Sequence, residues 1–476
     1  MDANEFRRNG HALIDWIAEY LDNVERYPVL SRVAPGDVRQ ALPSAPPEHG
    51  EPFADVLRDI ERTLVPALTH WNHPGFFAYF ASSSSAPGIL GELLAAALNQ
   101  QAMVWRTSPA ATELEAVTLD WLRQMVGLPA AFEGVIYDTA STSTLHALAA
   151  ARETAVAGVR EHGLAGRRGI GGVRIYCSEH AHSSVDKAAI TLGLGHTSVR
   201  RIPSDDEFGM RAEALREAID ADVAAGLAPI AVVATIGTTS TTSIDPLPAI
   251  AVICRERGVW LHVDAAYAGI AAVLPECRHH FAGWEDADSI VFNPHKWLFV
   301  PVDLSAFFCR RMDVVRQTFA LVPDFLQTPE GRAGVRNLMD TGFQLGRRFR
   351  ALKLWMVLRD FGVDGIKAVL AEHIRLARLF AGWVDADDHF ERLAPVPFSV
   401  VCFRARPPRL QTNDTALDDL NERLMAAVNA SGEVFLSHTR LNGRIALRLA
   451  VGSLRSEARH VARAWDLLRS HAEMMN

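Results

Sequence analysis

The sequence is poor in the features that mark secreted, membrane-spanning and nucleic-acid-binding proteins. Its 476 residues include only five cysteines, an odd number without CxxC spacing, which excludes a disulfide framework and predicts reduced thiols in a cytoplasmic protein. No apolar run is long enough to cross a bilayer, and the charged start lacks the apolar core of a signal peptide, so we expect no membrane association. Acidic residues outnumber basic ones by 56 to 48, and the net charge of −8 argues against nucleic acid as a partner.

Recognisable metal-binding patterns are missing as well. His180 and His182 are close together, but no third ligand stands at a suitable spacing and no HExxH motif occurs. We therefore expect no metal site.

The sequence does contain a long alternation of strand and helix patterns between about residues 86 and 370. The expected strands are short apolar runs at 134–137, 173–177, 230–234, 259–263, 289–292 and 304–309. This alternation predicts an α/β domain with a mainly parallel sheet and helices on both faces. Residues 371–476 combine expected strands at 398–403 and 444–450 with helical patterns, which predicts a small C-terminal α+β domain.

Residues 1–85 form the third predicted region, an N-terminal helical segment. Apolar residues between Phe6 and Leu21 recur at helical spacing and give that helix one apolar face. A helix in so short a segment must bury this apolar face against another part of the protein, and a partner subunit is the simplest explanation. We therefore expect residues 1–85 to be the dimerisation segment of a homodimer.

An amine and a carboxylate follow two of the expected strands. Asp264 ends the run 259–263, and Lys296 follows the run 289–292. Runs this apolar are buried on both faces, and open α/β sheets bind ligands in the crevice at the carboxyl ends of their strands. A lysine can form a Schiff base with an aldehyde, and an aspartate can hold a proton on a pyridine nitrogen. Enzymes that use pyridoxal 5′-phosphate (PLP) need both groups, so the pair predicts a PLP site.

Three more strand ends carry side chains that suit such a site. Residues 139–144 supply five hydroxyls before an expected helix at 145–152, where a phosphate finds backbone N–H donors. Alone, this segment also fits a helix cap without a ligand. His182 follows the run 173–177 and could stack on the cofactor ring, and residues 235–240 could place a hydroxyl near it.

A basic cluster stands at residues 347–353. It consists of Arg347, Arg348, Arg350 and Lys353. We expect these residues to lie on a helix whose face is solvated or salt-bridged, because that is the usual state of a charge run.

A set of motifs makes the chain resemble one enzyme family. They are His70-Trp71, Pro74, residues 76–80, Ser108-Pro109-Ala110, residues 112–115, residues 181–184, residues 262–267, residues 293–297, residues 345–350 and residues 446–451. In this order they resemble the PLP-dependent group II amino acid decarboxylases, in particular the aromatic L-amino acid decarboxylases. The resemblance implies a PLP enzyme of fold type I, a homodimer with composite active sites, and an aromatic amino acid as substrate.

The resemblance also implies a role for each motif residue. Lys296 would be the Schiff-base lysine, Asp264 would pair with the pyridinium nitrogen, and His182 and Ala266 would pack on the two ring faces. The phosphate would be bound by Ala140 and Ser141, helped by Asn293 and His295, with Thr239 nearby. The substrate pocket would be lined by Trp71, Tyr79, Phe80 and Ser82, with Gln101 and Met103 reaching in from the partner subunit.

One position departs from the family in a way that bears on the product. Relatives carry a tyrosine in a loop after the lysine, and its hydroxyl supplies the proton for amine release; this chain has Phe325 there. A phenyl ring has no O–H to donate. In the relatives called aromatic aldehyde synthases, loss of this tyrosine accompanies decarboxylation with oxidative deamination by dioxygen. Phe325 therefore predicts an aldehyde synthase, while simple amine release stays open if His182 or a water donates the proton.

Asp138 is a second departure, because many relatives carry glycine before the phosphate-binding residues. The choice among phenylalanine, tyrosine, DOPA and tryptophan as substrate stays open as well.

Two other classes compete with this interpretation. A PLP aminotransferase would share Lys296 and Asp264, but the sequence offers no clear arginine for the substrate α-carboxylate. A non-catalytic scaffold derived from the family should have lost one of these two residues, and both are present.

Overall fold

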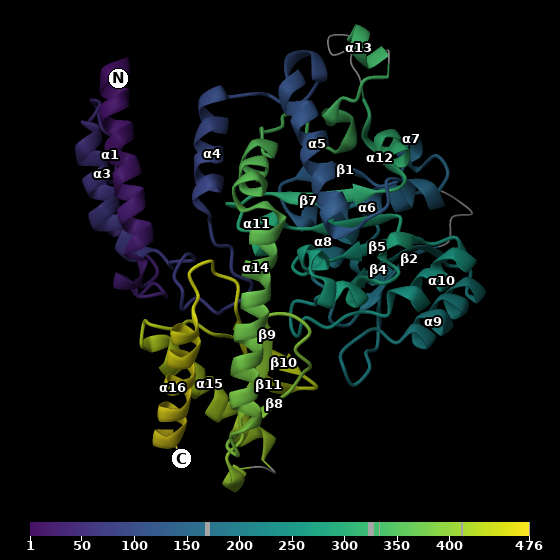
Figure 1. The fold of residues 1–476 in the computed structure, drawn as a ribbon. Coiled ribbons are helices and arrows are strands. Elements are labelled where there is room, and N and C mark those ends of the chain that lie inside the picture. The colour runs from purple at the N-terminus through teal and green to yellow at the C-terminus, as the bar shows by residue number, and fades with distance from the viewer. Residues whose placement is uncertain (167–171, 322–327, 333, 411–412, 476) are drawn as a thin grey trace. The chain divides into compact units, whose positions relative to one another are not determined.

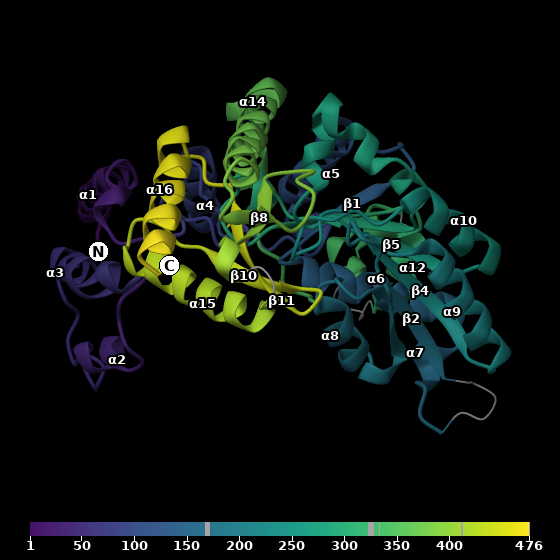
Figure 2. The ribbon, with the colours of Figure 1, turned by 90° about the horizontal axis from the view of Figure 1, so that it is seen from below.

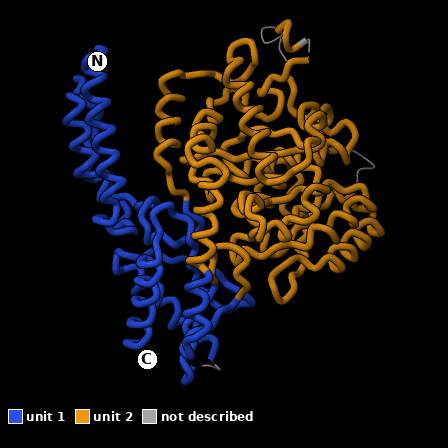
Figure 3. The backbone as a smooth tube through the Cα atoms, viewed as in Figure 1, with its two compact units in different colours: residues 1–81, 378–393, 402–476 blue, residues 82–377, 394–401 orange. Residues whose placement is uncertain are grey.

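The structure is a computed structural model that describes residues 1–166, 172–321, 328–332, 334–410 and 413–475. The chain divides into two compact units, which Figure 3 draws in different colours. Unit 1 comprises residues 1–81, 378–393 and 402–476, and unit 2 comprises residues 82–377 and 394–401. Both ends of the chain therefore belong to unit 1, and the long middle of the chain forms unit 2.

Unit 2 is built on a seven-stranded sheet with the strand order β1-β7-β6-β5-β4-β2-β3. The strands are β1 (Glu133–Tyr137), β2 (Val173–Ser178), β3 (Val199–Ile202), β4 (Ala228–Thr235), β5 (Trp260–Asp264), β6 (Ser289–Phe292) and β7 (Ser305–Cys309). All residues of β5, β6 and β7 are buried, which explains why these strands read as continuous apolar runs.

The direction of the strands decides which residues meet at each edge of the sheet. β2 to β6 pair in parallel, whereas β7 runs antiparallel to both β6 and β1. The carboxyl ends of β1, β2, β4, β5 and β6 therefore share one edge of the sheet with the start of β7.

Helices cover the sheet on both faces, as Figures 1 and 2 show. α6 (Ala140–Ala155) packs against β1 and β4 to β7 and contacts α8 (Ser184–Thr191) and α12 (Met312–Phe319). α9 (Ala212–Ala224) and α10 (Leu247–Arg257) contact each other and also pack against β4. The other helices of this unit include α4 (Ala86–Leu98), α5 (Pro109–Val126), α7 (Val159–His162), α11 (Pro294–Trp297) and α13 (Pro329–Arg332).

Unit 1 combines N-terminal helices with a second, four-stranded sheet. The helices are α1 (Ala3–Asp22), α2 (Asp37–Ala41), α3 (Phe53–Asp59), α15 (Asp414–Ala430) and α16 (Ala458–Met475). The sheet has the order β10-β11-β9-β8, from strands β8 (Phe390–Arg392), β9 (Val400–Ala405), β10 (Ser437–Leu441) and β11 (Arg444–Ala450), and the first two residues of β9 are assigned to unit 2. Helix α14 (Ala351–Asp385) contains a break at Gly362, where φ is +61°, and its residues are shared between the two units.

The predicted α/β fold with a mainly parallel sheet is confirmed, whereas the expected helix for the basic cluster is wrong in part. Arg347, Arg348 and Arg350 precede α14, and only Lys353 lies within it. Each of the four is salt-bridged as expected, but Arg347 and Lys353 are buried and not solvated. No helix in the described ranges is both long and apolar enough to span a bilayer.

Candidate active site

The carboxyl edge of the large sheet brings together residues from four strand ends. Asp264 ends β5 and is the direct neighbour of Thr235 on β4 and Val291 on β6. Beyond the strands, the Asn293 N–H donates to the Ala266 carbonyl oxygen over 2.9 Å, which ties the turn after β6 to the turn after β5.

Lys296 lies on the single turn of helix that follows β6. Its backbone N–H donates to the Asn293 carbonyl oxygen at 2.9 Å, so the short helix α11 begins at the end of the strand. Burial lowers the pKa of the Lys296 amine, and the nearby Asp264 carboxylate opposes part of that shift. A lysine with a lowered pKa holds more of its amine in the neutral, nucleophilic form.

Asp264 is only 5% exposed, and one of its carboxylate oxygens accepts the Ala266 N–H at 3.0 Å. Behind it on the same strand, His262 is fully buried, and burial lowers the pKa of its ring to about 4. The ring of His262 therefore stays neutral, and its Nδ1 pairs with the Ser289 hydroxyl at 2.9 Å. His262 thus takes its hydrogen bond within the sheet, and Asp264 is the titratable group at the end of β5.

His182 lies between β2 and α8, within electrostatic reach of both Asp264 and Lys296. Burial lowers the pKa of its ring, which favours the neutral form. Its Nδ1 accepts the backbone N–H of Ser184 at 3.1 Å, so the single proton of the neutral ring is on Nε2. His182 therefore presents an N–H donor from Nε2.

The hydroxyl-rich start of α6 is joined to the turn after β6 through the beginning of β7. The Ser143 hydroxyl pairs with the Ser305 hydroxyl at 2.9 Å, and the preceding residue, Leu304, donates its N–H to Nδ1 of His295 at 2.9 Å. Burial lowers the pKa of His295 to about 4, consistent with its role as an acceptor. Ser141, at the first turn of α6, is exposed, as an anion-binding residue needs to be.

This group of residues fits a pyridine aldehyde with a phosphate arm. It offers an amine, a carboxylate, a neutral imidazole and a helix N-terminus with hydroxyls. Three polar side-chain atoms nearby are buried without a hydrogen-bond partner among the described residues: Oδ1 of Asn293, Oγ of Ser184 and Oγ1 of Thr235. Unpartnered buried polar atoms are rare, and a polar ligand accounts for them.

The predicted substrate-pocket residues are divided between the two units. Trp71, Tyr79 and Phe80 belong to unit 1, where Trp71 and Tyr79 stack with ring centroids 6.1 Å apart, and Arg448 lies 5.5 Å from the centroid of the Phe80 ring.

Ser82, Gln101 and Met103 belong to unit 2. Gln101 accepts the Arg347 N–H at 2.7 Å, and Met103 packs against Val104 and Met339.

Three further positions complete the comparison with the predicted site. Thr239 is exposed in the turn that follows β4, and Ala266 is partly exposed after β5. Phe325 lies outside the described residues. Sequence reasoning missed Ser305, because its hydroxyl reaches this edge only if β7 is antiparallel, and a strand's direction leaves no mark in its own residues.

The fold and this edge of the sheet are those of a PLP enzyme of fold type I. Residues 35–406 match the model of the pyridoxal-dependent decarboxylase conserved domain, and the chain therefore belongs to the pyridoxal-dependent decarboxylase family. It is a PLP-dependent carboxy-lyase within the aromatic amino acid decarboxylase and aldehyde synthase group of that family.

Known relatives resemble the chain over nearly its whole length. Tryptophan decarboxylase 2 of Oryza sativa subsp. japonica is 41% identical, covering 99% of this chain and 95% of the relative. Phenylacetaldehyde synthase of a Rosa hybrid cultivar is 39% identical with the same coverage of both chains. The crystal structure of Oryza sativa TDC with PLP and tryptamine superposes with a TM-score of 0.96 at 38% identity, covering 100% of this chain and 99% of that one.

Proposed function

We propose that the chain decarboxylates aromatic L-amino acids and releases an aldehyde by oxidative deamination. The observation that carries the first part is the grouping of Lys296, Asp264 and His182 at one edge of the sheet. The observation that carries the second is Phe325, which replaces the hydroxyl donor of amine-forming relatives with a phenyl ring.

Each residue of the group has a definite task in this proposal. Lys296 holds the cofactor aldehyde covalently, and its lowered pKa keeps the amine reactive. Asp264 holds the proton of the pyridine nitrogen, because an almost fully buried carboxylate favours a cationic partner. When bound, the cofactor supplies an electron sink for the bond that releases carbon dioxide.

The neighbouring residues orient the reacting groups. His182 packs on the ring face, and Ala266 occupies the opposite face. Ala140 and Ser141 at the start of α6 bind the phosphate with Asn293 and His295, and Thr239 lies close by.

The substrate side chain is held among aromatic residues in this proposal. Trp71, Tyr79 and Phe80 supply apolar ring faces that suit an aromatic amino acid, and Ser82 borders them. Gln101 and Met103 are contributed by the partner subunit of a homodimer.

Exposed apolar side chains support the homodimer. Phe6 on α1 is 66% exposed, and Leu90, Leu93, Leu94 and Leu98 on α4 are 44–54% exposed. Apolar surface of this kind marks a protein interface. Sedimentation equilibrium of the purified chain should give twice the 52.2 kDa chain mass.

The oxidative route is balanced with dioxygen and water as co-reactants. One amino acid, one dioxygen and one water give one aldehyde, one carbon dioxide, one ammonia and one hydrogen peroxide. The electrons from the substrate Cα reduce dioxygen to peroxide, and water supplies the aldehyde oxygen after the nitrogen leaves as ammonia. Dioxygen is therefore a substrate of the proposed reaction.

Simple amine release is the second candidate, and one feature of the site favours it. His182 carries its proton on Nε2 and lies near Lys296, so it could protonate the substrate carbon in place of the missing phenol. Product analysis separates the two routes.

Carbon dioxide, hydrogen peroxide and ammonia should be measured under air with phenylalanine, tyrosine, DOPA and tryptophan. Equal amounts of the three products are expected for the best substrate, and Phe325→Tyr should shift the products toward the amine. Amine without peroxide from the unmodified chain would refute the oxidative route but not decarboxylation itself.

A further inference from the structure

A cavity opens at the edge of the large sheet opposite the candidate active site. Its volume is about 230 Å³, and it lies among the last turns of α6 and α10, the start of β5 and the residues after β7. Trp260 begins β5 at this cavity, and Asp264 ends the same strand at the candidate active site. Four residue-to-residue steps along the strand separate them by about 13 Å, at roughly 3.3 Å per step. The cavity is therefore distinct from the active site.

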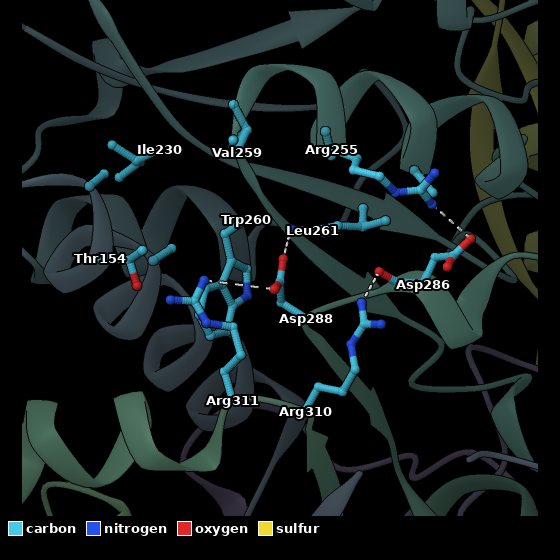
Figure 4. A pocket seen from close by; sticks show the side chains of 15 residues that line it. Thr154, Ile230, Arg255, Val259, Trp260, Leu261, Asp286, Asp288, Arg310 and Arg311 are labelled. Atoms are coloured by element: carbon cyan, nitrogen blue, oxygen red, sulfur yellow. Dashed lines mark hydrogen bonds and ion pairs between the residues drawn. The ribbon is translucent and has the colours of Figure 1, made fainter. Parts of the chain in front are cut away.

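The floor of this cavity is apolar, and its walls are charged. Ile230, Cys254, Val259 and Leu261 line the floor, and each is 5% exposed or less. Figure 4 shows Arg255, Arg310 and Arg311 along the walls, with Asp286 and Asp288 between them. Three guanidinium groups thus face two carboxylates, which leaves one positive charge in excess.

The three arginines have unused hydrogen-bond donors. Among the described residues Arg311 makes no side-chain hydrogen bond; its guanidinium lies 5.1 Å from the centroid of the Trp260 ring and 3.9 Å from Asp288. Arg255 makes one ion pair, at 3.3 Å with Asp286. Because a guanidinium carries five N–H donors, most of those at this cavity face space that only a ligand or water can fill.

Arg310 is similarly open. Its side chain donates once, to the carbonyl oxygen of Asp286, and its guanidinium lies 5.7 Å from the centroid of the Phe132 ring.

The two carboxylates do not use up these donors. Asp288 accepts the Leu261 N–H at 2.8 Å, and burial raises the pKa of its carboxyl group, which weakens it as an anionic partner. Asp286 is occupied by Arg255 through its side chain and by Arg310 through its carbonyl. The excess charge therefore faces the cavity, and it suits a monoanion better than a dianion.

We propose that this cavity binds a small organic carboxylate, whose charged group pairs with Arg311 and Arg255 while its apolar body lies on the floor beside Leu261. Guanidinium groups match carboxylates through paired N–H donors, so the arginines at this cavity suit a carboxylate ligand. The volume is below the roughly 300 Å³ of a pocket for drug-sized ligands, so the ligand has about one ring. The inference does not depend on the proposed function.

Benzoate is the probe, added to the full-length, PLP-loaded protein and followed by isothermal titration calorimetry. We expect saturable binding that weakens at least about tenfold in Arg311→Ala and in Arg255→Ala, because each loses charge-assisted hydrogen bonds. Arg216→Ala is the matched control. Arg216 lies on α9, does not line the cavity, and forms a surface ion pair with Glu256 of α10. Benzamide, which has the same shape without the charge, should bind at least tenfold more weakly than benzoate.

Each other outcome counts against the proposal. Absence of saturable benzoate binding, or equal binding of benzamide, would overturn it. Binding that shifts the cofactor's visible absorbance and survives in both arginine variants would place benzoate in the substrate site instead. Stronger binding of inorganic phosphate than of benzoate would show that the cavity prefers an inorganic anion, and the proposed organic carboxylate would be wrong. If Arg311→Ala fails to fold, Arg255→Ala decides, because the Arg255 side chain is 65% exposed and removing it leaves the core intact.

Discussion

Replacing Arg347 by methionine should destabilise unit 2 far more than an ordinary arginine substitution. Arg347 and Glu115 form an ion pair at 3.0 Å, with their side chains only 6% and 3% exposed. Arg347 also donates to the Ile136 carbonyl oxygen at 2.5 Å, and the Ile136 N–H donates to Glu115 at 2.9 Å. The pair therefore holds β1 two residues before Asp138.

The size of the effect follows from what remains after the substitution. Methionine fills much of the same space, but the buried Glu115 carboxyl group then has lost its cationic partner and keeps the Ile136 N–H as a hydrogen-bond donor. Breaking a buried pair in this way costs about 3–5 kcal/mol. The double variant Glu115→Gln with Arg347→Met removes both charged partners and should cost far less than Arg347→Met alone, so the two substitutions are expected to be strongly non-additive.

Urea unfolding followed by far-ultraviolet circular dichroism measures these differences. A chain of 476 residues need not unfold in one step, so the transition should be compared through its midpoint in each variant. Arg375→Met is the matched control, because Arg375 and Glu372 form an exposed pair worth at most about 1 kcal/mol. PLP affinity should fall with stability in Arg347→Met, since β1 leads into the start of α6.

Two results would refute this reasoning. One is an Arg347→Met variant that loses no more stability than Arg375→Met. The other is a double variant less stable than Arg347→Met alone, which would mean that the buried charge of Glu115 is not the source of the loss.

Three other predictions concern the active-site edge. Lys296→Ala should abolish the cofactor's visible absorbance and the borohydride-stable adduct, and an adduct that persists would place the covalent link on another residue. Asp138→Gly should tighten PLP binding severalfold in a fluorescence titration. The Asp138 carboxylate accepts the Thr139 N–H at 2.6 Å and therefore disfavours the cofactor phosphate as a second anion at the start of α6. An unchanged PLP affinity would contradict this reasoning. The folded-state pKa of His262, about 4, lies below its ordinary 6.5, so its neutral ring stabilises the fold fully above pH 6.5 and that contribution is lost as the pH falls toward 4. His262→Gln should therefore flatten the pH dependence of the unfolding midpoint in that range, and an unchanged slope would contradict the assignment.

The sequence was sufficient to predict most of the large sheet. Continuous apolar runs exist because β5, β6 and β7 are buried on both faces, so burial itself produced the signal. β3 was missed because its residues, Val199-Arg200-Arg201-Ile202, include two arginines at the edge of the sheet. β8 was missed because three residues carry too little pattern, and β10 because most of its residues are polar.

The candidate site was predictable where chemistry limits the choice of residue. Lys296, Asp264 and His182 stand at strand ends in the sequence, and the parallel pairing of β2 and β4 to β6 brings those ends together. The burial of Arg347 was not predictable, because its partner Glu115 lies 232 positions earlier and no local pattern joins them. The separation of the expected pocket residues into two units likewise depends on contacts between distant parts of the chain, and their roles stay predictions.

The position of β7 in the sheet has a consequence for the order in which the protein can assemble during synthesis. β1 lies at the end of the strand order, and its only neighbour in the described sheet is β7, which is made about 170 residues later. In a nascent chain that ends before Ser305, β2 to β6 can therefore pair with one another, but the strand that pairs with β1 has not yet been made. Because β1 leads into the start of α6, a ribosome-bound fragment should acquire the ability to retain the cofactor only after β7 has emerged.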